Sequence, residues 1–252
     1  MTGTFSQLTL WGGSSPILPR VLNYILTEAW PKQTHFLWQI SEHVSDRERM
    51  MHLMPAAMLL MQQGHTVEMW QAPPAPSYEN TNPEKHRHIA GLYRDAFQRA
   101  SRFDFCLSIE DDNLPPPAAF GHIIQHISAD TAQIGGVYRI RGSPDYINAS
   151  DSLANPWTPV KADMVPKRLI HTPMMGAGYT LYLGSALRRM RPVQCVVTTH
   201  KGYPMPHVAG WDDWVGREFA SMGYRSFSDG SLWIGHYTPE VASYLKANNL
   251  KI

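Results

Sequence analysis

The chain has few cysteines, no long apolar run and almost no net charge. Its 252 residues include two cysteines, Cys106 and Cys195, and the formal net charge is +1. Each cysteine lies in an apolar stretch, which favours buried free thiols over a disulfide framework or a zinc site. No apolar run reaches the roughly 18 residues of a membrane span, and the N-terminus lacks the pattern of a secretion signal. We therefore expect a cytoplasmic protein with no general attraction to polyanions.

Strand and helix patterns alternate along the first half of the chain. Apolar, strand-forming stretches predict strands at residues 7–13, 35–41, 65–71 and 103–109, with helices between them. Strands that alternate with helices form mostly parallel sheets, because each crossover returns the chain to the same edge. The predicted fold is therefore α/β and Rossmann-like, with a mixed, mostly parallel central sheet flanked by helices.

The predicted helix after residue 44 has a clear start and an apolar face. Ser45 and Glu48 have the spacing of a capping box, in which each side chain accepts a hydrogen bond from the other residue's backbone. Four methionines then recur at helical spacing and predict a broad apolar face toward the sheet: Met51, Met54, Met58 and Met61.

The pattern changes in the second half. We expect a strand at residues 132–140, followed by an irregular excursion to about Thr172, because this polar stretch has little periodicity and several prolines. Residues 174–184 combine a glycine-rich bend with a short strand, and Gly210 opens a helix that runs to Tyr224.

Three consecutive acids, Glu110, Asp111 and Asp112, follow the fourth predicted strand and precede three prolines. Acids after a strand are commonly solvated, and that is the simplest interpretation of these residues. However, ligands of parallel sheets bind at the carboxyl ends of the strands. A divalent cation at this position would also relieve the repulsion among the carboxylates.

Two further groups are ambiguous when taken alone. Asp212 and Asp213 begin a predicted helix, where the macrodipole stabilises negative charge whether or not the acids bind a substrate. His236 follows an apolar strand, a place where a histidine is often structural.

Taken in order, these groups resemble the motifs of GT-A-fold glycosyltransferases, most closely the inverting, family 2-like branch. Glu110-x-Asp112 is similar to the DxD motif, Asp212-Asp213 to the acidic xED pair, and His236 to the late histidine that serves as a metal ligand. Glu110 and Asp212 depart from the motif residues, but both keep the carboxylate. Two longer segments also match: residues 93–105, which lead into the DxD, and the glycine-rich residues 174–187.

The resemblance implies a metal site and a donor site. Mn²⁺ or Mg²⁺ would be held by Asp112, Glu110 and His236, and hard oxygen ligands suit both ions, whereas an imidazole favours Mn²⁺. The donor would be a UDP- or GDP-sugar. Its expected contacts come from the strand ends and the helix before the DxD: Glu110, Asp111, Asp112, Arg94, Asp95 and Gly12.

The resemblance also implies an acceptor side. Inversion requires a carboxylate that takes the proton of the acceptor hydroxyl, and Asp213 is the expected general base. The expected acceptor contacts are Asp212, Trp211, Gly176 and Gly178. We expect one domain over residues 1–252, with a nucleotide-sugar-binding half at 1–114 and an acceptor-binding half at 115–252.

The acceptor class and two other functions stay open at this stage. A glycan, a small molecule or a hydroxymethylated base in DNA would each supply a hydroxyl. DNA draws support from basic residues of the second half, and the near-zero net charge counts against it. These residues are Lys161, Lys167, Arg168, Arg188, Arg189 and Arg191. The alternatives to a transferase are a non-catalytic domain that binds a nucleotide or glycan, and a nucleotidyltransferase.

Overall fold

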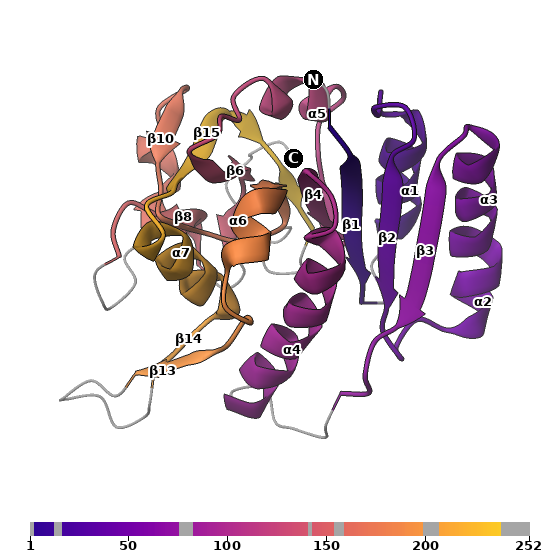
Figure 1. Ribbon diagram of the computed structural model, residues 1–252, viewed down its shortest axis with the longest axis horizontal. Coiled ribbons are helices and arrows are strands. Elements are labelled where there is room, and N and C mark those ends of the chain that lie inside the picture. The colour runs from indigo at the N-terminus through magenta and orange to yellow at the C-terminus, as the bar shows by residue number, and fades with distance from the viewer. Residues whose placement is uncertain are drawn as a thin grey trace.

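Eight strands form the central sheet of the computed structural model, which describes residues 3–12, 17–75, 83–140, 143–153, 159–198 and 207–237 (Figure 1). The strands are β1 (Phe5–Trp11), β2 (His35–Ile40), β3 (Thr66–Gln71), β4 (Phe105–Glu110), β6 (Thr131–Val137), β10 (Leu169–His171), β12 (Tyr179–Leu183) and β15 (Arg225–Trp233). Their order across the sheet is β10-β15-β6-β12-β4-β1-β2-β3.

The strand directions confirm the predicted mixed, mostly parallel sheet. β4, β1, β2 and β3 are parallel neighbours, and β6 and β15 are parallel to each other. β12 runs antiparallel between β4 and β6, and β10 runs antiparallel at the edge beside β15. The register pairs Leu10 with Glu110, so β1 and β4 end side by side. This alignment places the acidic segment at the carboxyl edge of the sheet.

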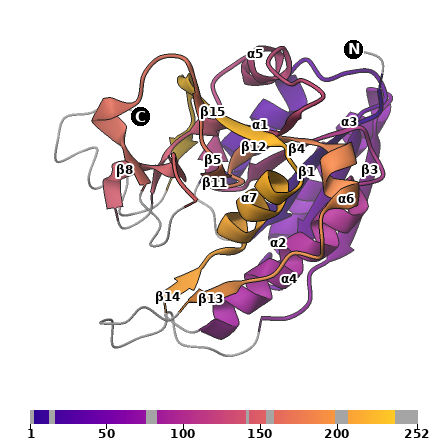
Figure 2. The same cartoon turned by 60° about the vertical axis from the view of Figure 1, so that its left-hand side comes forward.

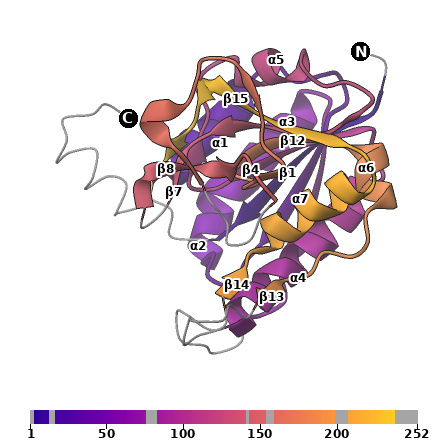
Figure 3. The same ribbon diagram turned by 90° about the vertical axis from the view of Figure 1, so that its left-hand side faces the viewer.

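Helices cover both faces of the sheet, and the alternation of side chains along each strand gives the sheet two apolar faces. α1 (Leu18–Thr27), α3 (Met54–Gln62) and α5 (Ala119–Ile124) pack on one face. α4 (Pro83–Ala100), α6 (Gly184–Arg189) and α7 (Trp211–Ser221) pack on the other. Figures 2 and 3 show α4 and α7 lying together against this second face.

The second helical segment confirms the capping box and contradicts the predicted methionine face. Ser45 caps α2 (Asp46–Glu48), and a π-helical turn (Arg49–Leu53) leads into α3. Met51 and Met58 are 63% and 54% exposed, and the buried residues are Leu53, Ala56, Ala57 and Leu60. The segment is apolar on nearly all sides, so periodicity does not identify the inner face. The small alanines let that side approach the sheet closely.

The stretch predicted to be irregular forms a small sheet instead. β7 (Arg139–Ile140), β8 (Ser143–Ser150) and β11 (Met174–Met175) pair in the order β11-β8-β7, and β9 (Pro159–Lys161) pairs with β8. A 3₁₀ turn (Ala162–Met164) follows β9. Its own apolar cluster holds this sheet together: Val137, Ile147, Ala149, Ala162 and Met175. The prediction was wrong because the pairing of β8 with β11 joins segments far apart in the sequence.

Two short strand pairs complete the described structure. β5 (Asn113–Leu114) pairs with β16 (Gly235–His236), and β13 (Val196–Thr198) pairs with β14 (His207–Ala209). Cys106 is buried, as predicted, whereas Cys195 is only half-buried, and neither forms a disulfide with a described residue. Within the described residues, no helix is long and apolar enough to cross a membrane.

Replacing Ser45 with alanine tests the capping box. Both bonds of the Ser45 hydroxyl with Glu48 would be lost, and we expect the free energy of unfolding to fall by about 1 kcal/mol. Chemical denaturation measures the change. Ser45→Thr retains a capping hydroxyl and should stay within a few tenths of a kcal/mol of the parent. Equal stability of all three proteins would contradict a stabilising role for the cap.

Candidate active site

A cavity of about 480 Å³ lies at the carboxyl ends of β1, β2, β3 and β4, beside α4. Glu110, Asp111 and Asp112 all line it. Trp11 and Gly12 contribute from the end of β1, and Lys85, His88 and Tyr93 contribute from α4. The cavity therefore has the position expected for a ligand of a parallel sheet, and the acidic segment forms part of its wall.

Asp111 connects the end of β4 to the end of β1. The backbone N–H of Gly12 donates a 2.7 Å hydrogen bond to Asp111 Oδ2. The side-by-side ends of the two strands make this contact possible. The bond turns one of the three carboxylates toward β1 and fixes its place on the cavity wall.

Glu110 is held by groups from two other segments. The Tyr93 hydroxyl donates a short hydrogen bond to Glu110 Oε1, and Asn113 Nδ2 lies 3.4 Å from Oε2. Burial, followed by the negative charge of Asp112, raises the pKa of Glu110 to about 7, although Tyr93 and His236 oppose the shift. The surroundings of the Glu110 carboxyl therefore favour its protonated form more than water does.

Asp112 and His236 face each other across the β5–β16 pair, in which His236 aligns with Asn113. His236 Nε2 lies 3.3 Å from Asp112 Oδ2, and Asn113 Nδ2 donates a 2.7 Å bond to Asp112 Oδ1. His236 Nδ1 donates to the carbonyl of Arg139 at 2.7 Å, so the proton is fixed on Nδ1 and Nε2 is turned toward the aspartate. Burial lowers the pKa of His236, but the interactions with Asp112 and Arg139 outweigh it and leave the pKa raised.

These residues fit a divalent cation. Asp112 Oδ2 and His236 Nε2 offer a carboxylate oxygen and an imidazole nitrogen side by side, and the carbonyl of Arg139 orients the imidazole. Asn113 Oδ1 is buried next to them and accepts no hydrogen bond from any described residue. Glu110, in contrast, is occupied by Tyr93 and Asn113. The donor set suits Mn²⁺ better than Mg²⁺ because it includes a nitrogen.

An aromatic stack connects the start of α7 to the acidic segment. The Trp211 ring lies on the Tyr93 ring, with 3.5 Å between centroids and 15° between planes. Since the hydroxyl of Tyr93 bonds Glu110, the stack links α7, α4 and β4. Trp211 is only 8% exposed, and its ring also meets the ring of Phe97, with 5.9 Å between centroids.

The two aspartates of α7 have different environments. Asp213 is 7% exposed, and its oxygens lie 3.1 and 3.2 Å from Nε of Arg217, one helical turn later. Asp212 is half-buried, and its Oδ1 accepts a 3.1 Å bond from the backbone N–H of Asp213. Burial raises the pKa of Asp212 to about 6, although that hydrogen bond lowers it.

Tyr138 and Asn113 complete the site, and the sequence patterns did not identify them. Tyr138 is buried, its hydroxyl accepts a 3.1 Å bond from the N–H of Gly178, and its pKa is raised by burial and then by Glu110 and Asp212. A Cβ at Gly176 would overlap the Tyr138 hydroxyl, and one at Gly178 would lie 2.8 Å from the amide of Asn113. The two glycines therefore make room for these side chains.

Arg94 and Asp95 do not line the cavity. Arg94 is exposed. Asp95 accepts a 2.7 Å bond from the indole N–H of Trp70, and Arg99 lies 3.5 Å away. The structure thus brings together Glu110, Asp111, Asp112, Gly12 and His236, with Trp211 stacked on Tyr93. Arg94 and Asp95 lie outside the cavity lining, although Asp95 contacts Gln39, which belongs to it.

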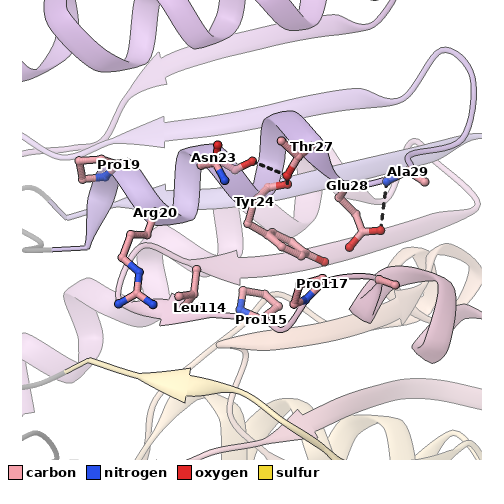
Figure 4. Close-up of a pocket in the computed structure, with 11 residues that line it drawn as sticks. Pro19, Arg20, Asn23, Tyr24, Thr27, Glu28, Ala29, Leu114, Pro115 and Pro117 are labelled. Carbon is pink, nitrogen blue, oxygen red and sulfur yellow. Dashed lines mark hydrogen bonds between the residues drawn. The ribbon is translucent and has the colours of Figure 1, made fainter. Parts of the chain in front are cut away.

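A second cavity, of about 650 Å³, lies between α1 and the proline-rich segment after β5 (Figure 4). Arg20, Tyr24 and Glu28 line one side, and Leu114 and Pro115 line the other. The guanidinium of Arg20 also lies 5.1 Å from the ring centroid of Tyr237, the residue after His236. The cavity therefore adjoins the β5–β16 pair that carries the candidate metal ligands.

No family model matches the sequence, and a comparison with curated proteins finds no match. Similar folds occur among solved structures. The mannosyltransferase PcManGT from Pyrobaculum calidifontis, in complex with GDP-Man and Mn²⁺, has a TM-score of 0.58 and 11% identity over 97% of this chain and 60% of that one. GalNAc-T7 with UDP, GalNAc and Mn²⁺ has a TM-score of 0.57 and 11% identity over 95% and 45%.

Residues 1–349 of S. aureus TarS, in complex with UDP-GlcNAc, have a TM-score of 0.52 and 10% identity over 95% of this chain and 61% of that one. The chain spans less than two thirds of the length of each of these three structures. At such low identity the likeness establishes the fold alone. The chain shares the GT-A fold of these structures, as the resemblance implied.

Substitution of Gly176 tests the packing around Tyr138. We expect Gly176→Ala to lower the free energy of unfolding by about 1–3 kcal/mol, because the new methyl group would overlap the Tyr138 hydroxyl. Denaturant titration measures the loss. Gly121→Ala is a matched control, since a Cβ there meets nothing within 4 Å.

A second variant separates this overlap from a general effect of alanine. Tyr138→Phe removes the hydroxyl, so the double variant should be more stable than the sum of the two single changes predicts, by about 1 kcal/mol. Additive losses would show that the hydroxyl and the methyl group do not meet.

Proposed function

We propose that the protein is a metal-dependent glycosyltransferase that moves a sugar from a nucleotide-sugar donor to a hydroxyl acceptor with inversion. The observation that carries the proposal is the Asp112–His236 pair, held at the carboxyl end of β4 beside a cavity of about 480 Å³. Complexes of similarly folded proteins with GDP-Man and Mn²⁺, with UDP and Mn²⁺, and with UDP-GlcNAc support it.

In this proposal residues 1–114 bind a UDP- or GDP-sugar. Asp112 and His236 would hold Mn²⁺ or Mg²⁺, with Glu110 beside them, and the cation would neutralise charge on the departing diphosphate. Asp111 and the backbone of Gly12 form the β1 side of the cavity, and Lys85 adds a positive charge to its wall. The nucleotide would therefore occupy the ends of β1 to β4.

We assign the general base to Asp212 rather than to Asp213. The base must be ionised, reachable by the acceptor and not engaged by a cation. Asp213 is buried against Arg217, whereas no described cation pairs with Asp212, which is half-buried and has a raised pKa. Asp213 then orients the first turn of α7. Trp211, Gly176 and Gly178 support the site through Tyr93, Tyr138 and Asn113.

We propose a glycan or small-molecule hydroxyl as the acceptor, bound by residues 115–252. Two of the arginines that would favour DNA, Arg188 and Arg191, are engaged within the protein. Arg188 donates to the carbonyls of Ser101 and Phe103, which precede β4 at the amino edge of the sheet, opposite the acids. Arg191 forms an ion pair with Glu218. A cluster engaged in this way does not form a surface beside the cavity.

The proposal predicts cation-dependent release of nucleotide. A panel of UDP- and GDP-sugars with Mn²⁺, assayed with and without hydroxyl acceptors, should identify at least one donor that is hydrolysed or transferred. Asp112→Ala should reduce the rate at least 100-fold, because the cation loses its carboxylate ligand. Asp163→Ala, which removes an exposed carboxylate on the 3₁₀ turn, should leave the rate unchanged.

If no donor binds or reacts, and Asp112→Ala changes neither Mn²⁺ nor nucleotide binding, the glycosyltransferase proposal fails. Donor binding without turnover by any acceptor would instead support a non-catalytic binding domain.

The choice of base predicts opposite behaviour of two variants. Asp212→Asn should keep donor affinity and melting temperature but lower kcat by about 10²–10⁴-fold. Asp213→Asn should mainly lower the melting temperature, because Arg217 loses an ionised partner. Single-turnover kinetics and thermal melts distinguish them. Loss of kcat in Asp213→Asn alone would return the role of base to Asp213.

The pH dependence follows from the same carboxylate. The base acts in its ionised form, and burial raises the pKa of Asp212 to about 6. We therefore expect kcat to be constant above that pH and to fall about tenfold per pH unit below it. Measurement of kcat at saturating donor and acceptor from pH 5 to 8 tests this. A rate that stays constant through this range would exclude Asp212 as the base.

A further inference from the structure

A second group of ligand-type side chains lies away from the proposed active site. His122 on α5, His126 just after α5, and Asp229 on β15 place three ligand atoms within 4.8 Å of one another. Asp229 pairs with Gly136 in the interior of the sheet register, and α5 packs across β6 and β15. The proposed function uses none of these residues.

The carboxylate of Asp229 is fixed in one orientation. Its Oδ1 accepts bonds from the backbone N–H of Ser231 at 2.9 Å and from the Ser231 hydroxyl at 2.5 Å. Its Oδ2 is thereby left to face the two histidines. The side chain is only 2% exposed. Carboxylates that bind a metal are commonly held in place by such hydrogen bonds from neighbouring groups.

Both imidazoles converge on that one oxygen. His122 Nε2 lies 2.8 Å and His126 Nε2 lies 3.7 Å from Asp229 Oδ2. A single hydrogen bond from His122 would satisfy the buried oxygen, and 3.7 Å is too long for a second. Hydrogen bonding therefore explains one histidine and not the other.

A tetrahedral zinc ion explains both. Two ligands at about 2.1 Å from Zn²⁺ are roughly 3.4 Å apart, and the two N–O distances fall on either side of that value. Small side-chain shifts would bring both Nε2 atoms and Asp229 Oδ2 within ligand distance of one zinc ion. The Ser231 hydroxyl, 3.3 Å from His122 Nε2, or a water would fill the fourth position.

The histidines also provide access. The side chains of His122 and His126 are 39% and 30% exposed, so an ion reaches the cluster from solvent while the carboxylate stays buried. Two imidazoles and one carboxylate favour zinc or a similar transition metal over Mg²⁺, which prefers oxygen ligands.

We propose that His122, His126 and Asp229 form a zinc site that fastens α5 to β15. The chain enters α5 from the prolines after Asp112 and leaves β15 toward His236. A cation at this position would therefore brace the two segments that carry the Asp112–His236 pair. The proposed site is separate from that pair and does not depend on any transferase activity.

Zinc titration of the metal-free protein tests the proposal. Asp112→Ala serves as the starting protein, so that the other candidate metal site does not contribute. We expect it to bind one equivalent of Zn²⁺ in competition with a chromophoric chelator, to gain melting temperature with Zn²⁺, and to be indifferent to Mg²⁺. Co²⁺ should give the intense visible bands of a tetrahedral site.

His126→Ala in the same background is the informative variant, because the His122–Asp229 hydrogen bond stays in place and preserves the fold. It should bind zinc at least tenfold more weakly and lose the thermal gain and the tetrahedral cobalt bands. His52→Ala, at an exposed histidine of the π-helical turn, is the matched control and should behave as the parent does. No zinc binding, or equal binding by the parent and His126→Ala, would overturn the site.

Discussion

Mutual repulsion among three carboxylates at the end of β4 is the constraint on which the rest of the site depends. Each acid is held by a different part of the chain: Asp111 by the backbone of Gly12 just after β1, Glu110 by α4, and Asp112 by β16. Burial and a neighbouring charge still leave the pKa of Glu110 near 7. The structure thus concentrates negative charge where the sheet opens into a cavity, an arrangement that a bound cation would stabilise.

Aromatic side chains connect the acidic segment to neighbouring helices and strands. Tyr93 bonds Glu110 through its hydroxyl and stacks on Trp211 through its ring, so one side chain joins the acidic segment to the start of α7. Tyr138 fills the space beside Gly176 and Asn113 the space beside Gly178, and a Cβ at either glycine would collide with that neighbour. Trp211 packs on Tyr93, which lines the cavity, and the two glycines leave room for Tyr138 and Asn113 next to the acids.

Local patterns predicted much of the fold. The strands before the acids, the capping box at Ser45 and the mostly parallel sheet are all present. The patterns failed where local sequence is uninformative. An α3 segment that is apolar on nearly all sides does not reveal which side is buried, and β8 and β11 pair over a long separation that no short-range pattern records.

By itself the sequence determined three features: that acids stand at a strand end, in which order the later acids and the histidine follow, and to which class the fold belongs. These depend on residue type and short-range spacing. The tertiary structure alone decided which groups meet. The β5–β16 pairing brings His236 to Asp112, Arg217 engages Asp213 and leaves Asp212, and α5 carries His122 and His126 to Asp229. Contacts between distant segments depend on sheet order and helix packing, which residue spacing does not encode.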